Sequence, residues 1–305
     1  MASILPPPAR GIYAADVVAR AVSPVPLGTL CLIGGAEDRS GPRDVLRHFL
    51  ELAGGAGARV AVVATASSLG PEILESYAEV FTDLGAGDVI PVRPASRVEA
   101  DDPDLAGRLA DVDAVFMTGG NQLKLTAVVG GTRFGDAIRS AYQKGAVVGG
   151  TSAGASAVSE HMIAFGDEHD TPRQGVTGSA AGLGLLPDVI VDQHFSQRNR
   201  YGRLLSLVAR SPRLLGLGVD EDTAAVIRGG HLLEVVGASC VLVADGSAAV
   251  TDAHLAELGA PLLVSGVVIH TLPSGARFDL ARRALVDFQE EHLAGQLVRR
   301  PEEDG

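Results

Sequence analysis

A serine inside a glycine-rich pentapeptide is the first residue of this chain that could do covalent chemistry. Residues 150–154 are Gly-Thr-Ser-Ala-Gly, which fits the pattern Gly-x-Ser-x-Gly. In that pattern the serine lies on a tight strand-to-helix turn, so its neighbours are small and its hydroxyl is exposed. The turn also places the Ala153 N–H at a helix N-terminus, where it can donate to a developing oxyanion. The pattern predicts that Ser152 is a nucleophile, although similar turns with an incidental serine are common in α/β proteins.

A serine hydroxyl needs a base, and the base needs a partner that fixes its tautomer and orientation. Of the eight histidines, His194 lies just past an apolar strand, at the sheet edge where Ser152 should also lie. His161 is expected on the helix after Ser152, pointing away from the hydroxyl, and His169 lies in a polar loop. We therefore predict His194 as the base, with His169 as a weaker candidate.

The acidic partner of this histidine stays open from the residues alone. Glu221 ends its own strand at the same edge, and Asp220 and Asp222 flank it, so a register error of one residue would change the choice. Asp192 shares a strand face with His194, because residues i and i+2 point the same way. The order serine, histidine, acid differs from that of α/β-hydrolases, and the chain lacks their His-Gly-Gly-Gly segment. A lipase or esterase is therefore disfavoured.

Polar and cationic residues near these positions could bind a substrate. Gly120, in a glycine pair after a predicted strand, can bring a second backbone N–H to the oxyanion, while Asn121 beside it also suits a helix N-cap. Three arginines follow His194 closely, and guanidinium groups suit substrate carboxylates, whereas Asp192 could meet a substrate guanidinium. The expected substrate-binding side chains are Asn121, Gln122, Asp192, Gln193, Arg198, Arg200 and Arg203.

Alternating strands and helices must position these residues. Strands are predicted at 29–33, 59–64, 88–92, 112–117, 189–192 and 214–219. A further strand is predicted directly before Ser152. Helices are predicted at 42–53 and 71–84, from Asn121 onward, and at 134–143 and 196–210. This alternation predicts an α/β fold with a parallel sheet and helices on both faces, whose ligand site lies at the carboxyl ends of the strands.

The pattern changes after residue 219. A hairpin at 224–236, strands at 239–244 and 265–270, and an amphipathic helix at 278–293 are predicted. We expect them to form an antiparallel C-terminal extension packed on the same sheet. The chain is then one α/β catalytic domain, 28–298, with a proline-rich N-terminal extension, 1–27, and a charged tail, 299–305.

Composition narrows the class of partner. The formal net charge of −12 argues against nucleic acid and anionic membranes, which need clustered cations. Cys31 and Cys240 each lie in an apolar run, which is typical of buried thiols in a reducing compartment and not of a disulfide framework or metal site. No apolar window reaches the roughly 18 residues of a membrane span, and no signal-peptide pattern is present. A cytoplasmic protein is expected.

Five segments of the chain, in order, resemble one family. They are Gly34-Gly-Ala-Glu-Asp-Arg39, Thr118-Gly-Gly-Asn-Gln-Leu-Lys-Leu125, Gly150-Thr-Ser-Ala-Gly-Ala155, Asp192-Gln-His-Phe-Ser-Gln-Arg-Asn-Arg-Tyr-Gly-Arg203 and Gly218-Val-Asp-Glu-Asp-Thr-Ala224. Over about residues 28–290 the chain is similar to the cyanophycinases, serine peptidases related to aspartyl dipeptidase. The resemblance implies a flavodoxin-like, class I glutamine-amidotransferase-like fold with a mostly parallel sheet. It also implies hydrolysis of cyanophycin, a poly-aspartate whose side-chain carboxyls carry arginine, to β-aspartyl-arginine dipeptides.

Carried over position by position, the resemblance implies Ser152 as nucleophile, His194 as base and Glu221, in preference to Asp192, as its partner. The substrate-recognition residues that it implies are Gln193, Arg198, Arg200 and Arg203, with Asp192 close by. The resemblance implies that no metal and no cofactor is needed and that the protein is a homodimer. The first 27 residues depart from the compact members of the family, which lack such a segment.

Two alternatives share the fold. An aspartyl or isoaspartyl dipeptidase would have the same triad, but it should lack the arginine-rich run that follows His194 here. A binding module that has lost the chemistry is disfavoured, because every position of the predicted triad is filled.

Overall fold

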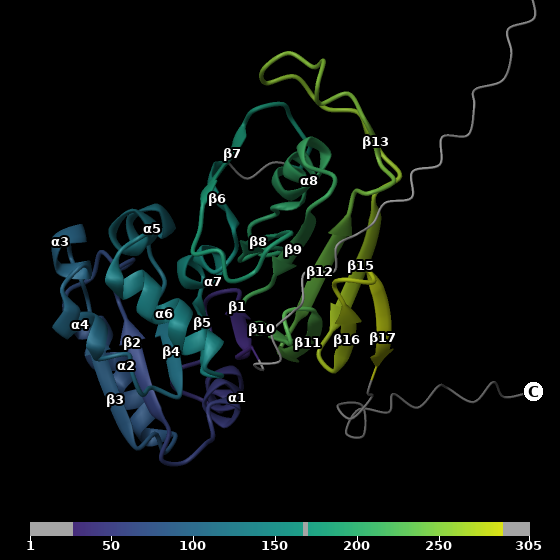
Figure 1. The fold of residues 1–305 in the computed structure, drawn as a ribbon. Coiled ribbons are helices and arrows are strands. Elements are labelled where there is room, and N and C mark those ends of the chain that lie inside the picture. The colour runs from purple at the N-terminus through teal and green to yellow at the C-terminus, as the bar shows by residue number, and fades with distance from the viewer. Residues whose placement is uncertain (1–26, 167–169, 289–305) are drawn as a thin grey trace, which may run out of the picture.

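The structure is a computed structural model that describes residues 27–166 and 170–288. The helices are α1 Asp44–Leu52, α2 Glu72–Asp83, α3 Arg97–Ala100, α4 Pro103–Gly107, α5 Gln122–Val129, α6 Arg133–Gln143, α7 Ala153–Ala157 and α8 Tyr201–Arg210. The strands are β1 Leu30–Ile33, β2 Arg59–Val63, β3 Asp88–Val92, β4 Ala114–Met117, β5 Val147–Thr151, β6 His161–Gly166, β7 Thr177–Ala181, β8 Val189–Gln193, β9 Leu215–Val219, β10 Thr223–Arg228, β11 Leu232–Gly237, β12 Cys240–Asp245, β13 Val250–Thr251, β14 Val264–Ser265, β15 Val268–Pro273, β16 Ala276–Asp279 and β17 Ala284–Phe288. Their arrangement is shown in Figure 1.

A nine-stranded sheet forms the centre of the fold, in the order β17-β16-β11-β10-β1-β5-β4-β2-β3. From β1 to β3 the neighbouring strands are parallel. From β1 to β17 they are antiparallel, so the later strands do extend the first sheet. The α/β class and the antiparallel C-terminal extension are thus confirmed, although the sheet is mixed and not mostly parallel.

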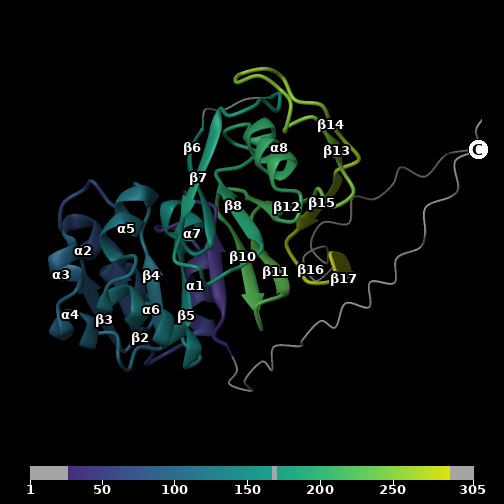
Figure 2. The same ribbon diagram turned by 45° about the horizontal axis from the view of Figure 1, so that its top comes forward.

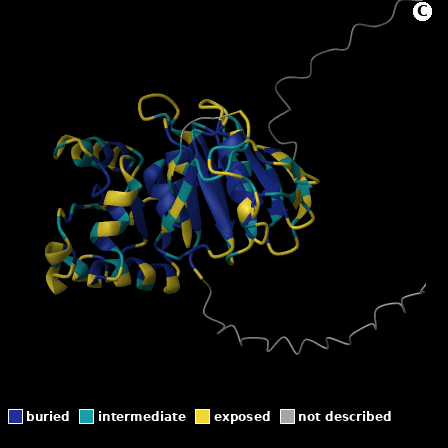
Figure 3. Ribbon diagram, turned by 90° about the horizontal axis from the view of Figure 1, so that it is seen from above, coloured by how far each residue is buried: buried dark blue, intermediate teal, exposed yellow. Residues whose placement is uncertain are grey.

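Helices cover both faces of this sheet because its strands are apolar at successive positions. In β1, Leu32 packs in one apolar cluster with Ile138 of α6. The next residue, Ile33, packs in a second cluster with Phe49 of α1 on the opposite face. Continuous apolar runs are typical of strands that are buried on both sides. Figure 3 accordingly shows the central strands buried and the outer turns of the helices exposed.

A second sheet of four strands, in the order β15-β12-β9-β8, lies beside the first. Its β8 and β9 are parallel to each other, and β12 runs antiparallel to β9. Leu207 of α8 packs on Ile190 of β8 and covers one face (Figure 2). The expectation that β8 and β9 continue the sheet of Ser152 was wrong, and so was the expectation that all later strands join it. Local patterns predict strands but do not select the partner of each strand.

Two predicted helices were wrong in whole or in part. Residues 278–288 of the expected helix 278–293 form the end of β16 and β17, because alternate residues such as Ala276 and Phe278 are buried, which is a strand pattern. The helix expected at 196–210 begins only at Tyr201, since Asn199 adopts a left-handed conformation with φ 48°. His161 lies in the β6–β7 hairpin and not on a helix.

Some expectations fall outside the described residues. These are His169, residues 289–293 of the expected helix, the tail 299–305, and the extension 1–27 apart from Leu27. Within the described ranges, no helix has the length and apolarity needed to cross a bilayer.

Candidate active site

Ser152 occupies a sharp junction between β5 and α7. Its φ of 51° and ψ of −107° lie outside the regions that L-residues ordinarily adopt. The turn is held by a 2.9 Å hydrogen bond from the Ser152 N–H to the carbonyl oxygen of Ile33 on the neighbouring strand. It also requires a small residue at Gly154, where a Cβ atom would lie 2.2 Å from the Met117 carbonyl oxygen. These constraints turn the hydroxyl out of the sheet.

Three side chains from two sheets form a hydrogen-bonded relay. His194 Nε2 lies 2.9 Å from the Ser152 hydroxyl oxygen, and His194 Nδ1 lies 2.6 Å from Glu221 Oε1. Ser152 follows β5 of the nine-stranded sheet, whereas His194 and Glu221 follow β8 and β9 of the four-stranded sheet. The histidine side chain is only 12% exposed and the glutamate side chain 33%. A nucleophile, a base and an orienting carboxylate in this order have the geometry of a serine hydrolase triad.

The glycine pair Gly34-Gly35, which follows β1, positions the backbone of this relay. The His194 N–H donates to the Gly34 carbonyl oxygen at 2.7 Å, and the Asp222 N–H donates to the Gly35 carbonyl oxygen at 2.9 Å. Gly35 has φ 104°, and a Cβ there would lie 2.2 Å from His194 Cε1. Sequence reasoning placed this segment at the site edge but missed its positioning role. The paired glycines were the available signal.

The environment of His194 favours its neutral form. Burial, the largest influence, lowers the pKa of His194 below the ordinary value, and the hydrogen bond to Glu221 opposes that shift. The nearby charge of Arg198 lowers this pKa further. A neutral imidazole can accept the serine proton, so the histidine is in the protonation state of a general base at neutral pH.

Backbone groups on the other side of Ser152 could stabilise an oxyanion. The Ala153 N–H stands at the first position of α7, where a helix leaves N–H groups without intrahelical partners. Gly119 lies against the serine, since a Cβ there would be 3.6 Å from Ser152 Cβ. Gly120 has φ 141° and packs against Ala66, leaving no room for a side chain. Gly120 and Ser152 line the same cavity, and the role of the Ala153 and Gly120 N–H groups as oxyanion donors stays a prediction.

Asn121 and Gln122 are engaged within the protein. The Asn121 side-chain oxygen accepts from the Lys124 N–H at 3.1 Å, which makes it the N-cap of α5. The Gln122 side-chain amide donates to the Ile163 carbonyl oxygen at 2.9 Å and ties α5 to β6.

Asp192 lies in a buried ionic network and does not face the cavity freely. Its side chain is 0% exposed. Arg203 donates to both of its carboxylate oxygens, at 2.8 and 2.5 Å, and Arg200 donates to one of them at 3.3 Å. Arg200 also donates to the side-chain oxygen of Gln193 at 2.8 Å. Arg198 differs from these residues, because it is exposed beside His194.

A cavity of about 550 Å³ opens over the serine. Ser152 and His194 line it, together with Glu37, Arg39 and Tyr77 from the β1–α1 loop and α2. Sequence reasoning did not single out these last three residues. Glu37 is 7% exposed, accepts a 2.5 Å hydrogen bond from the Thr151 hydroxyl, and accepts another from the Tyr77 hydroxyl.

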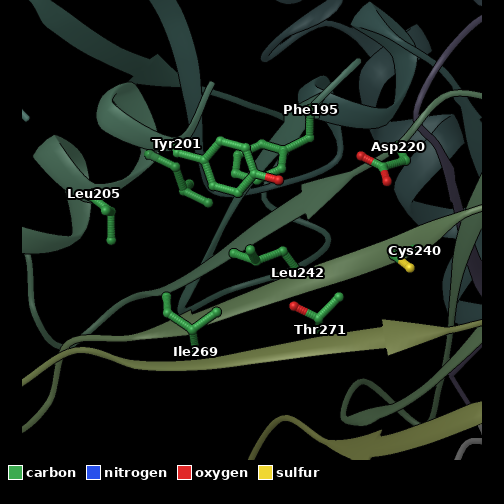
Figure 4. Close-up of a pocket in the computed structure, with 9 residues that line it drawn as sticks. Phe195, Tyr201, Leu205, Asp220, Cys240, Leu242, Ile269 and Thr271 are labelled. Carbon is green, nitrogen blue, oxygen red and sulfur yellow. The ribbon is translucent and has the colours of Figure 1, made fainter. Parts of the chain in front are cut away.

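A second cavity of about 390 Å³ lies between α8 and the four-stranded sheet (Figure 4). Its lining is mainly apolar, with Tyr201, Leu242 and Ile269 among the side chains. The carboxylate of Asp220 borders it but accepts hydrogen bonds from the Ser196 N–H at 2.9 Å and the Ser239 hydroxyl at 2.8 Å. No triad side chain lines this cavity, so hydrolytic chemistry is assigned to the cavity over Ser152.

Comparison with known proteins identifies the family. The model of peptidase family S51 matches residues 30–235, which include all three triad positions. The chain belongs to this family. It is therefore a serine-type peptidase, and the expectation of a hydrolase is confirmed.

Curated relatives are similar over most of the chain. The cyanophycinase of Geminocystis herdmanii is 37% identical over 253 residues, covering 82% of this chain and 93% of the relative. The cyanophycinase of Trichormus variabilis is 38% identical over 258 residues, covering 84% and 86%. A crystal structure of a peptidase from an acI-B1 Actinobacterium superposes with a TM-score of 0.62 at 21% identity, covering 84% of this chain and 98% of that one. This last similarity concerns the fold.

Proposed function

We propose that this protein is a cyanophycinase, a serine-type exopeptidase that releases β-aspartyl-arginine dipeptides from cyanophycin. The observation that carries the proposal is the Ser152–His194–Glu221 relay, whose nucleophile and base line an open cavity. The choice of cyanophycin as the substrate is supported by the similarity, at 35–38% identity, to curated proteins that are named cyanophycinase.

In the proposed reaction, Ser152 attacks the backbone carbonyl on the C-terminal side of a substituted aspartate. His194 takes the hydroxyl proton and then delivers it to the leaving amine, while Glu221 holds the imidazole in the required tautomer. The Ala153 N–H and the N–H near Gly120 stabilise the oxyanion. A water molecule, activated by the same histidine, then hydrolyses the acyl-enzyme. The strand-to-helix turn at Ser152 acts as a nucleophile elbow.

The expected recognition residues divide into two groups. Arg198 is exposed beside His194 and fits direct contact with a substrate carboxylate. Asp192, Arg200 and Arg203 are buried together, so we propose that they hold the loop carrying His194 and the start of α8. Gln193 supports the loop through Arg200. Asn121 and Gln122 do not line the cavity, so we propose that they support the neighbouring glycines Gly119 and Gly120 by fixing the N-terminus of α5.

The test is clearing of purified insoluble cyanophycin with mass spectrometry of the products, for wild type beside Ser152→Ala. We expect dipeptides of aspartate and arginine from the wild type only. A wild type that leaves the polymer intact but hydrolyses short aspartyl or isoaspartyl peptides would establish the alternative dipeptidase. A wild type that also fails to react with a serine-directed phosphonate would establish a catalytically silent binding module.

We also propose that residues 28–298 act as one catalytic domain, because the nucleophile comes from one sheet and the base from the other. We propose further that the protein is a cytoplasmic homodimer. The free thiols of Cys31 and Cys240 support the cytoplasmic location. The exposed side chains of Leu285 and Val286 on the edge strand β17 support the dimer. Light scattering of the purified protein and fractionation of the host cell test these two points.

A further inference from the structure

One wall of the catalytic cavity carries two opposite charges that take no part in the triad. Glu37 and Arg39 both line the cavity that contains Ser152 and His194. Neither forms an ion pair with any residue in the described ranges. A carboxylate and a guanidinium that face one cavity without pairing are available to a ligand that carries both charges.

Glu37 is the more unusual of the two, because it is 7% exposed. Buried carboxylates are ordinarily paired with a cation. Its partners here are two neutral hydroxyls, from Tyr77 and Thr151. An ionised carboxylate has roughly four acceptor positions, so about two remain for a ligand. The two hydroxyls hold the carboxylate in place but bring no positive charge to it.

Arg39 is held near the same wall by an aromatic ring. Its guanidinium carbon lies 5.4 Å from the centroid of the Tyr77 ring, and Nη1 lies 3.5 Å from the Ser76 hydroxyl. The side chain is exposed, which leaves most of its donors accessible. A planar guanidinium supported on a ring is suited to bidentate binding of a carboxylate.

The ligand that fits is an arginine joined to the polymer through its α-amine. Such a branch keeps a guanidinium at one end and a free α-carboxylate at the other. We propose that Glu37 and Arg39 form a subsite for this branch, in which Glu37 accepts from the guanidinium and Arg39 donates to the α-carboxylate. The proposal rests on the proposed function. Because Glu37 is bonded to Thr151, which directly precedes Ser152, the subsite lies beside the scissile bond.

The test uses three matched oligomers of poly-aspartate, each with a branch on every side-chain carboxyl. Their branches are arginine, citrulline, which replaces the guanidinium by a neutral urea, and arginine amide, which lacks the carboxylate. For the wild type we expect kcat/KM to fall on the order of tenfold to a hundredfold with either altered branch, as for loss of a charged hydrogen bond. Glu37→Gln should abolish the preference for arginine over citrulline only. Arg39→Gln should abolish the preference for arginine over arginine amide only.

This crossed pattern separates the subsite from general damage. Arg133→Gln, which changes an exposed arginine outside the cavity, is the control and should keep both preferences. If both cavity variants keep the wild-type preferences, the subsite is wrong. If Glu37→Gln does not fold, competitive inhibition of the wild type by β-aspartyl-arginine and β-aspartyl-citrulline replaces it, and equal inhibition overturns the role of Glu37. Failure of the proposed function looks different, because the wild type would then cleave none of the oligomers while still reacting with a phosphonate.

Discussion

The main-chain N–H of His194 donates a 2.7 Å hydrogen bond to the carbonyl oxygen of Gly34, and this bond joins the two sheets at the active site. His194 follows β8 of the four-stranded sheet, whereas Gly34 follows β1 of the nine-stranded sheet, next to the strand that carries Ser152. The distance between base and nucleophile therefore depends on how the two sheets are held together. The glycine segment after β1 therefore helps to position the base of the triad.

Gly35→Ala should reduce kcat by about a hundredfold or more, because misplacing a catalytic group by about 1 Å has effects of this size. The added Cβ would lie 2.2 Å from His194 Cε1, so the imidazole must move. Steady-state kinetics with cyanophycin measures the loss. Gly54→Ala is the matched control, since Gly54 has φ 108° against 104° at Gly35 but no atom within 4 Å of the new Cβ. Equal losses in the two variants would assign the effect to backbone strain alone.

The acid limb of the wild-type pH–rate profile should have an apparent pKa below about 6.5, the ordinary value for histidine. The reason is that burial lowers the pKa of His194, and the imidazole must be neutral to act as base. The measurement is kcat/KM between pH 4 and pH 8 with a soluble oligomer, alongside circular dichroism to exclude unfolding. An acid limb above the ordinary histidine value would contradict this account of the base.

Glu221→Gln should lower kcat by roughly 10³- to 10⁴-fold, because the imidazole loses the partner that selects its tautomer. The residual activity should show its acid limb at lower pH than the wild type. The sign follows from the hydrogen bond of Glu221, which raises the pKa of His194, so its removal lets that pKa fall. Asp222→Asn serves as the neighbouring control. An acid limb that shifts upward in Glu221→Gln would rule out this pairing.

Arg198→Gln should shift the acid limb slightly upward, because the positive charge of Arg198 lowers the pKa of His194. The shift should be small at high salt, since Arg198 is exposed and its field is screened. If Arg198 contacts substrate, KM should rise more than kcat falls. Measuring KM and kcat at low and high ionic strength separates a direct contact between Arg198 and the substrate from the effect of its charge on the pKa of His194.

Asp192→Asn should destabilise the fold by about 3–5 kcal/mol, because it leaves the buried guanidinium groups of Arg200 and Arg203 without their shared carboxylate. Urea unfolding measures the change. Asp188→Asn breaks an ion pair with Arg213 whose side chains are 54% and 79% exposed, so it should change stability by less than about 1 kcal/mol. A stable Asp192→Asn protein with weakened substrate binding would instead favour direct recognition by Asp192.

Local chemistry in the sequence determined much of this site. The small residues around Ser152 predicted the turn because a tight strand-to-helix junction needs them, and the structure has that junction. His194 was predicted from its position at a strand end, and Asn121 as an N-cap from its residue type. Each of these properties depends on a few neighbouring residues, so a short window of sequence contains the information.

The tertiary structure decided what depends on distant partners. The residues alone left the acid open, with Asp192 and the two neighbours of Glu221 as alternatives to Glu221. The choice follows from which carboxylate is within reach of His194 Nδ1 after two separate strands pair. The same reason explains the error over the two sheets, since a strand pattern does not contain the identity of its neighbour. It also explains why Glu37 and Tyr77, 40 residues apart, were missed as one wall of the cavity. Their meeting requires the loop after β1 and helix α2 to lie side by side in the folded chain.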